Sequence, residues 1–194
     1  MKAGIARRSA NAADLCGDMA GWWSRDGFEI VAIADGLGHG KDAAVAAEAA
    51  IEAAAAWPTS DLLGLFGYKN QVLQPTRGAA VGVAVVDWAA RQITYAALGN
   101  TRAVVLGSQL THLVGYAGIV GKSYRRLRTV SVAFNPGDLL LLWTDGLQEE
   151  IELTIADRAA PHLDDVARRL LDRFSKGNDD ACILVAHLIE GSGQ

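Results

Sequence analysis

The sequence of 194 residues contains little cysteine and little proline. The first shortage bears on metal sites and the second on which residues form the turns. Its two cysteines, Cys16 and Cys182, are widely spaced and form no CxxC pair, so they do not make a zinc site. Cys182 lies in an apolar run, which favours a reduced core residue. Because there are only 4 prolines against 21 glycines, glycine is expected to provide most of the turns.

Long apolar runs and blocks of like charge are also missing. No stretch approaches the roughly 20 uninterrupted apolar residues of a membrane helix, and no apolar run of a signal peptide follows Lys2, Arg7 and Arg8. The formal net charge of -4 disfavours a basic stripe for nucleic acid. We therefore expect a soluble, cytoplasmic protein that binds neither a membrane nor a nucleic acid.

Residues 122–128 (KSYRRLR) are a local exception to the acidic balance. A short run of this kind is more often a solvated face than a docking surface, and we interpret it in this way. A local docking patch is the alternative, and the sequence alone leaves it open.

The chain nevertheless has ample material for a folded core. Hydrophobic residues make up 51% of the sequence and charged residues 21%, which is not a disordered composition. We find no internal repeat and no low-complexity linker. The length and the even composition together predict a single domain over residues 1–194.

Helices are expected in three places. Residues 43–56 are nearly all alanine, which has the highest helix propensity, with Asp42 as a cap and Pro58 as the terminator. Residues 61–73 predict a second, weaker helix. Residues 162–174 carry their apolar side chains on one stripe, which predicts a third.

Short apolar segments rich in β-branched residues predict a series of strands. The connections in the middle of the chain are shorter than the dozen or so residues that a parallel crossover needs, so these strands are expected to pair antiparallel, with a hairpin turn at 87–90. Many antiparallel strands with two long helices inserted predict an α+β layered domain. The predicted strands are 28–34, 79–87, 91–98, 102–106, 110–114, 128–134, 138–143 and 181–189.

Acidic residues recur at the ends of these apolar runs. Asp35 and Asp145 each close a run and precede a glycine, Asp179 and Asp180 precede the last strand, and Asp18 follows a cysteine and a glycine. Any single Asp-Gly pair is more often a turn, but four sites placed alike favour convergence at one rim of a sheet. Two unit charges about 4 Å apart repel by about 4 kcal/mol at an effective dielectric of 20, and Mg²⁺ or Mn²⁺ would remove that cost.

The loop ADGLGHGKD at residues 34–42 looks at first like a phosphate cradle, but it fails both nucleotide templates. A Walker loop requires a glycine where Asp35 stands and a serine or threonine where Asp42 stands. In a Rossmann fingerprint the third glycine would come one residue later. The loop suits a carboxylate and a backbone carbonyl that are presented together to a cation.

The acidic motifs CGD, ADGLGHG, WTDGLQE and NDDACILV occur in the order found in PPM (type 2C) metal-dependent serine/threonine phosphatases. RGA at 77–79 and GNTR at 99–102 resemble the compact bacterial branch that includes SpoIIE and the Rsb stress-response phosphatases. The resemblance covers essentially the whole chain. It implies an αββα sandwich of two antiparallel sheets flanked by helices, which agrees with the predicted order of elements.

The resemblance also implies a site with two Mn²⁺ or Mg²⁺ ions. In it Asp35 bridges both ions, the carbonyl of Gly36 binds one, and Asp145 and Asp179 bind the other. Asp18 binds directly or holds metal-bound water. Two such ions activate a water for in-line attack on phosphorus, so no covalent protein intermediate is needed.

Other positions match the family pattern less closely. Asp180 matches the residue beside the last ligand and is expected to support the ligands rather than to bind an ion itself. Asn100 stands where larger members place an acid that can hold a third ion, so a third ion is not expected. His39 is a candidate general acid for the leaving serine or threonine oxygen, with an ordinary loop histidine as the alternative. Arg7 and Arg8 lie too far before the first motif to match the phosphate-binding arginine of many eukaryotic members.

By the same resemblance, the substrates are phosphorylated STAS-domain proteins of a stressosome, and the outcome is to reset the bacterial general stress signal. A monomer is expected. Two alternatives stay open. One is a phosphatase of the same type that acts on an anti-anti-sigma factor or a sporulation regulator. The other is a module that binds phosphoproteins without turnover.

Overall fold

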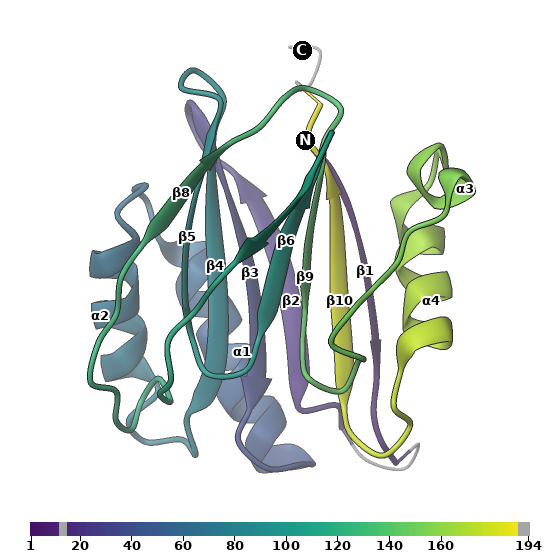
Figure 1. Cartoon of the computed structure of the whole chain (residues 1–194). Helices are drawn as coiled ribbons and strands as arrows, with labels where there is room; N and C mark the ends of the chain where they lie inside the picture. The colour runs from purple at the N-terminus through teal and green to yellow at the C-terminus, as the bar shows by residue number, and fades with distance from the viewer. Residues whose placement is uncertain (12–14, 190–194) are drawn as a thin grey trace.

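The computed structural model describes residues 1–11 and 15–189 (Figure 1). One antiparallel sheet has the strand order β2-β3-β4-β5-β8 and the other has the order β1-β10-β9-β6-β7. The first sheet consists of β2 (Asp18–Ser24), β3 (Phe28–Gly36), β4 (Ala79–Asp87), β5 (Gln92–Leu98) and β8 (Val130–Ala133). The second consists of β1 (Lys2–Arg8), β6 (Arg102–Leu106), β7 (Leu110–Leu113), β9 (Leu139–Trp143) and β10 (Ala181–His187).

Helices cover the outer faces of the two sheets. α1 (Lys41–Ala56) and α2 (Leu62–Val72) lie against the first sheet, and α4 (Leu163–Phe174), preceded by the short α3 (Ile155–Arg158), lies against the second (Figure 1). The predicted αββα sandwich of two antiparallel sheets is therefore confirmed. No helix within the described ranges is long and apolar enough to cross a membrane.

Burial on both faces explains the continuous apolar run of β3. Val31 and Ile33 point into the layer between the two sheets, whereas Ile30, Ala32 and Ala34 point toward the helices. A strand that is covered on both faces needs no alternation of polar and apolar residues. β3 therefore contributes side chains to both cores, as does its neighbour β4.

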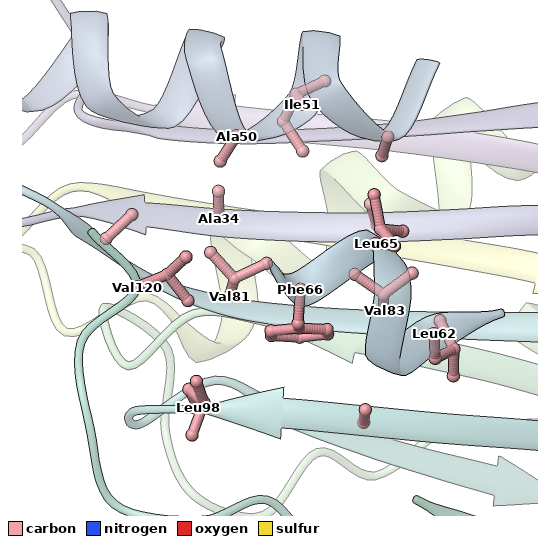
Figure 2. Close-up of a cluster of buried hydrophobic side chains, with 14 of the residues drawn as sticks. Ala34, Ala50, Ile51, Leu62, Leu65, Phe66, Val81, Val83, Leu98 and Val120 are labelled. Atoms are coloured by element: carbon pink, nitrogen blue, oxygen red, sulfur yellow. The ribbon is translucent and has the colours of Figure 1, made fainter. Parts of the chain in front are cut away.

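The alanine-rich sequence of α1 allows this helix to lie close to the sheet. Ala43, Ala46, Ala47, Ala50 and Ala54 are all buried. Figure 2 shows Ala50 opposite Ala34 of β3, in a cluster that includes side chains of α2 and β4. Small side chains on both surfaces permit this close approach, and the first turn of α1 is thereby fixed against the end of β3.

Several details differ from the sequence-based expectation. β1 and β2 were not anticipated, because both are edge strands with partly exposed residues and so carry a weak apolar pattern. Asp42 was expected to cap α1, which is wrong: Gly40 is the N-cap, and Asp42 lies in the first turn and pairs with Arg77 at 2.6 Å. The hairpin at 87–90 is confirmed, since Asp87 Oδ1 accepts the Ala90 N–H at 2.8 Å. Cys182 is buried and free, as predicted.

A lysine lies in the apolar layer between α1 and α2. Lys69 is fully buried, and its Nζ donates a hydrogen bond to the carbonyl oxygen of Ala50 in α1. No ion pair of the described chain involves it. Burial lowers the pKa of Lys69 to about 7, because the charged ammonium is desolvated there.

Replacing this lysine tests that description. Between pH 7 and the usual lysine pKa of about 10.4, Lys69 binds a proton in the unfolded chain that it does not bind in the folded chain. Its contribution to the free energy of unfolding therefore rises with pH by up to about 1.4 kcal/mol per unit. Lys69→Met should remove this rise and raise the free energy of unfolding at pH 7 by about 1–3 kcal/mol. Urea unfolding at pH 7.5 and 9.5 measures both effects. The exposed Lys2→Met is the control, and an unchanged pH slope in Lys69→Met contradicts the description.

Candidate metal centre

Four strand ends meet at one end of the sandwich, at the lower edge in Figure 1. Asp18 is the first residue of β2 and lies directly opposite Asp35, near the end of β3. In the other sheet, β9 ends just before Asp145, and β10 begins just after Asp179 and Asp180. β9 and β10 pair antiparallel, so these acids lie at the same end of that sheet. The fold thus brings together carboxylates that are far apart in the sequence.

The glycines of the two Asp-Gly pairs are required by close packing. A Cβ atom on Gly36 would collide with the carbonyl oxygen of Ala43 in the first turn of α1. A Cβ atom on Gly146 would collide with the carbonyl oxygen of Asp180. Glycine therefore lets the chain after each aspartate pass against a neighbouring backbone, which fixes where Asp35 and Asp145 stand.

Asp180 connects the two sheets at this end. Its Oδ1 accepts the N–H of Ala10 at 2.8 Å, and its Oδ2 accepts the N–H of Gly17 at 2.6 Å. The carbonyl of Gly17 in turn accepts the N–H of Gly36 at 2.9 Å. Both carboxylate oxygens of Asp180 therefore accept backbone hydrogen bonds. These bonds fix the position of Gly17, which precedes Asp18 and is hydrogen-bonded to Gly36.

The carboxylates at this end of the sandwich repel one another, and Asp18 and Asp180 among them are buried. Asp18 is only 2% exposed, and its Oδ2 is buried with no hydrogen-bond partner. Burial, and then the charge of Asp35, raise the pKa of Asp18 to about 8. Burial, and then the charges of Asp145, Asp179 and Asp180, raise the pKa of Asp35 to about 7. No ion pair in the described part of the chain involves these carboxylates.

Asn100 stands between two of these acids. Its Nδ2 donates a hydrogen bond to Asp145 Oδ2 at 2.7 Å, and its side chain also stabilises the ionised form of Asp35, which opposes the rise in the pKa of Asp35. An amide at this point separates two carboxylates without adding a further negative charge. In the sequence, only the GNTR motif at residues 99–102 indicated a role for Asn100.

Lys176 was missed by the sequence reasoning. Its Nζ donates to the carbonyl oxygen of Asp145 at 2.7 Å, and its N–H donates to the carbonyl of Gly146 at 2.9 Å. The side chain is exposed, so an ammonium group stands at the rim of the carboxylate cluster. The only indication in the sequence was its place three residues before the predicted ligand Asp179. Lysines are common in such loops, so this indication is weak.

His39 is not brought into contact with the acids. It is exposed in the loop between Gly36 and α1, and its side chain makes no hydrogen bond or ion pair with the described residues. Arg77 lies against the same loop: a Cβ atom on Gly38 would stand 2.9 Å from its Nη1.

The donor set fits a hard divalent cation. All the side-chain donors are carboxylate oxygens, one of them buried and unpartnered, and cations would relieve their mutual repulsion. No three acidic, histidine or cysteine side chains among residues 1–11 and 15–189 already converge as an ion would require. Asp145 and Asp179 instead hold local partners, Asn100 and the N–H of Asp180 at 2.9 Å. Cation binding would exchange these hydrogen bonds for coordination.

Comparisons with known proteins agree with this architecture. Residues 26–189 match the family model described as Stage II sporulation protein E (SpoIIE). Phosphoserine phosphatase RsbX of Bacillus subtilis (strain 168) is 25% identical over 135 residues, which cover 69% of this chain and 68% of that protein.

Solved structures give the same picture. One solved structure superposes on this chain with a TM-score of 0.89 at 28% identity, covering 95% of this chain and 98% of that one. It is described as "The bacterial stressosome: a modular system that has been adapted to control secondary messenger signaling". RsbX in complex with magnesium shares the fold, with a TM-score of 0.77 at 20% identity over 93% of this chain and 92% of that one. The chain therefore belongs to the SpoIIE family, in the RsbX/SpoIIE branch of the PPM (type 2C) serine/threonine phosphatases.

Proposed function

We propose that this chain is a divalent-metal-dependent phosphatase that removes phosphate from serine or threonine on STAS-domain proteins of a stressosome and so resets a bacterial stress signal. The observation that carries the hydrolytic part is the pair of facing carboxylates Asp18 and Asp35. Asp18 is buried with one oxygen unpartnered, Asp35 is half-buried, and no basic side chain of the described residues forms an ion pair with either. A site of that charge repels a phosphoester unless cations occupy it.

The residues proposed to hold two Mn²⁺ or Mg²⁺ ions are Asp18, Asp35, Asp145 and Asp179, with the carbonyl of Gly36. When bound, such ions supply Lewis acidity and an activated water for attack on phosphorus. The chain itself positions these donors. Asn100 fixes Asp145, and Asp180 fixes the backbone next to Asp18 and Gly36.

Other side chains of the rim serve the substrate in this proposal. The ammonium group of Lys176, held beside Asp145, attracts the dianionic phosphoester. His39 is exposed on the loop after Gly36 and is the proposed donor of a proton to the leaving oxygen. Its exposed position lets it approach a phosphorylated residue that enters from solvent.

The proposed substrate class is supported by the relatives. RsbX is named a phosphoserine phosphatase, and the stressosome chain at 28% identity is covered over nearly its full length. The match to the SpoIIE model favours a second candidate, a phosphatase of a sporulation regulator or an anti-anti-sigma factor. Phosphate release from a panel of phosphorylated STAS-domain proteins separates the two candidates.

Asp35→Asn tests the catalytic site. The exchange removes the proposed bridging ligand, so Mn²⁺-dependent phosphate release from a phosphorylated STAS-domain protein should fall by about 10²-fold or more. Asp26→Asn, an exposed position in the β2–β3 turn, is the matched control and should retain activity. Full activity of Asp35→Asn in the presence of excess chelator would sink the proposal. Metal binding without turnover by the native chain would favour a binding module.

Stability as a function of pH tests the carboxylate cluster without any substrate. Because the folded-state pKa values of Asp18 and Asp35 are raised to about 8 and 7, the metal-free chain should lose stability as pH rises from about 4 to about 8. Saturating Mn²⁺ should restore stability at pH 8, by about 2.7 kcal/mol at a hundred times the dissociation constant. Unfolding by urea in chelator and in Mn²⁺ measures this. If the stability of the metal-free chain does not fall between pH 5 and 8, Asp18 and Asp35 do not repel each other as described.

A further inference from the structure

The middle of the chain has an uneven charge distribution. Residues 88–137 contain no aspartate or glutamate, although the whole chain has a net charge of -4. Four of the basic residues in this range fall within residues 122–128, which we call the basic segment: Lys122, Arg125, Arg126 and Arg128.

The backbone of the basic segment is anchored to the core. Tyr124 and Leu127 are partly buried and pack against the cluster beneath α1 and α2. The N–H of Ile119 donates to the carbonyl of Ser123 at 3.0 Å, and the N–H of Gly121 donates to Asn70 Oδ1 in α2 at 2.9 Å. The apolar residues of the segment therefore point inward, and its charged residues are left on the surface.

The charges of the basic segment are not neutralised within the described chain. All four basic side chains are exposed, and none forms an ion pair with a described residue. Arg126 lies over the ring of Tyr116 at 5.6 Å, and Lys122 Nζ donates to the carbonyl of Gln74 at 3.3 Å. A cluster of exposed cations without ion-pair partners is a surface that attracts anionic groups.

The basic segment borders the end of the sheet that carries the acids. Val120, just before it, bridges to Ala79, and Ala79 pairs on its other side with Gly36 of the metal loop. Tyr116 bridges to Leu98, and its carbonyl accepts the N–H of Gly99 at 2.9 Å, next to Asn100. In Figure 1 the connection between β7 and β8 reaches the same lower edge, below α2. A protein bound at the carboxylate cluster would meet this surface.

A groove on the second sheet has an acidic lining. Glu149, Glu150 and Glu152 follow Asp145 and line a groove with Trp143 and His112 on the outer face of the second sheet. Arg102 pairs with Glu149 at 2.9 Å and neutralises only one of these charges.

We propose that the basic segment docks an acidic surface next to the phosphorylated residue of a protein substrate. This inference rests on the proposed function. It adds that the enzyme prefers substrates whose phosphorylated residue is flanked by acidic residues. Attraction between the acidic flank of the substrate and Arg125 and Arg128 lowers KM and accelerates encounter, and the effect weakens with salt.

The experiment compares two phosphoserine peptides that differ only in their flank, one with four aspartates and the other with four asparagines. At 50 mM NaCl the native chain should hydrolyse the acidic peptide with a kcat/KM about fivefold higher or more. Arg125→Gln combined with Arg128→Gln should bring the ratio close to one, because it removes two of the exposed positive charges. Neither side chain forms an ion pair with a described residue, so the fold should be unaffected. Arg158→Gln with Arg168→Gln removes the same charge from α3 and α4 and should keep the native ratio.

Each outcome is decisive. Equal kcat/KM for the two peptides with the native chain, or an unchanged ratio in the Arg125 and Arg128 variant, overturns the docking surface. Loss of the ratio in the Arg158 and Arg168 control also overturns it, because net charge alone would then explain the preference. If the native chain hydrolyses neither peptide nor para-nitrophenyl phosphate in Mn²⁺, the proposed function itself has failed.

Discussion

The burial of like charges at the end of the sandwich is the constraint on which the rest of the structure depends. Asp18 and Asp35 face each other on neighbouring strands, and Asp145 and Asp179 approach from the other sheet. In the absence of cations this arrangement costs free energy, which is expressed as raised carboxyl pKa values. The surrounding architecture keeps the acids close despite that cost: Gly36 and Gly146 allow tight backbone crossings, and the alanine helix α1 packs closely on β3.

The same constraint accounts for the division of roles among the polar residues. Asp180 uses both carboxylate oxygens to hold backbone N–H groups, so it acts on the position of the strand ends. Asn100 separates Asp145 from Asp35 with a neutral amide. Lys176 and the basic segment provide positive charge outside the cluster, where it can attract an anion without replacing a cation at the centre.

Much of this fold could be predicted from the sequence, because β3, β4, β9 and β10 are buried and read as continuous apolar runs. The edge strands β1 and β2 could not, since partial exposure leaves them without a clear pattern. Asp35, Asp145, Asp179 and Asp180 were predictable because each lies at the end of a buried strand, whereas Asp18 was recognised only from its motif. Lys176 was not, since its place depends on the pairing of residues 146–148 with residues 174–176, and these short segments show no strand pattern in the sequence. The role of His39 stays a prediction.

The central claim is that two divalent cations neutralise this cluster. Anomalous diffraction from crystals grown with Mn²⁺ tests it most directly, because manganese can be located without assumptions about its ligands. Two manganese peaks are expected beside the carboxylate of Asp35, one of them next to the carbonyl of Gly36 and the other next to Asp145 and Asp179. The absence of manganese from this end of the sandwich at saturating Mn²⁺, or its binding only elsewhere on the chain, would contradict the account.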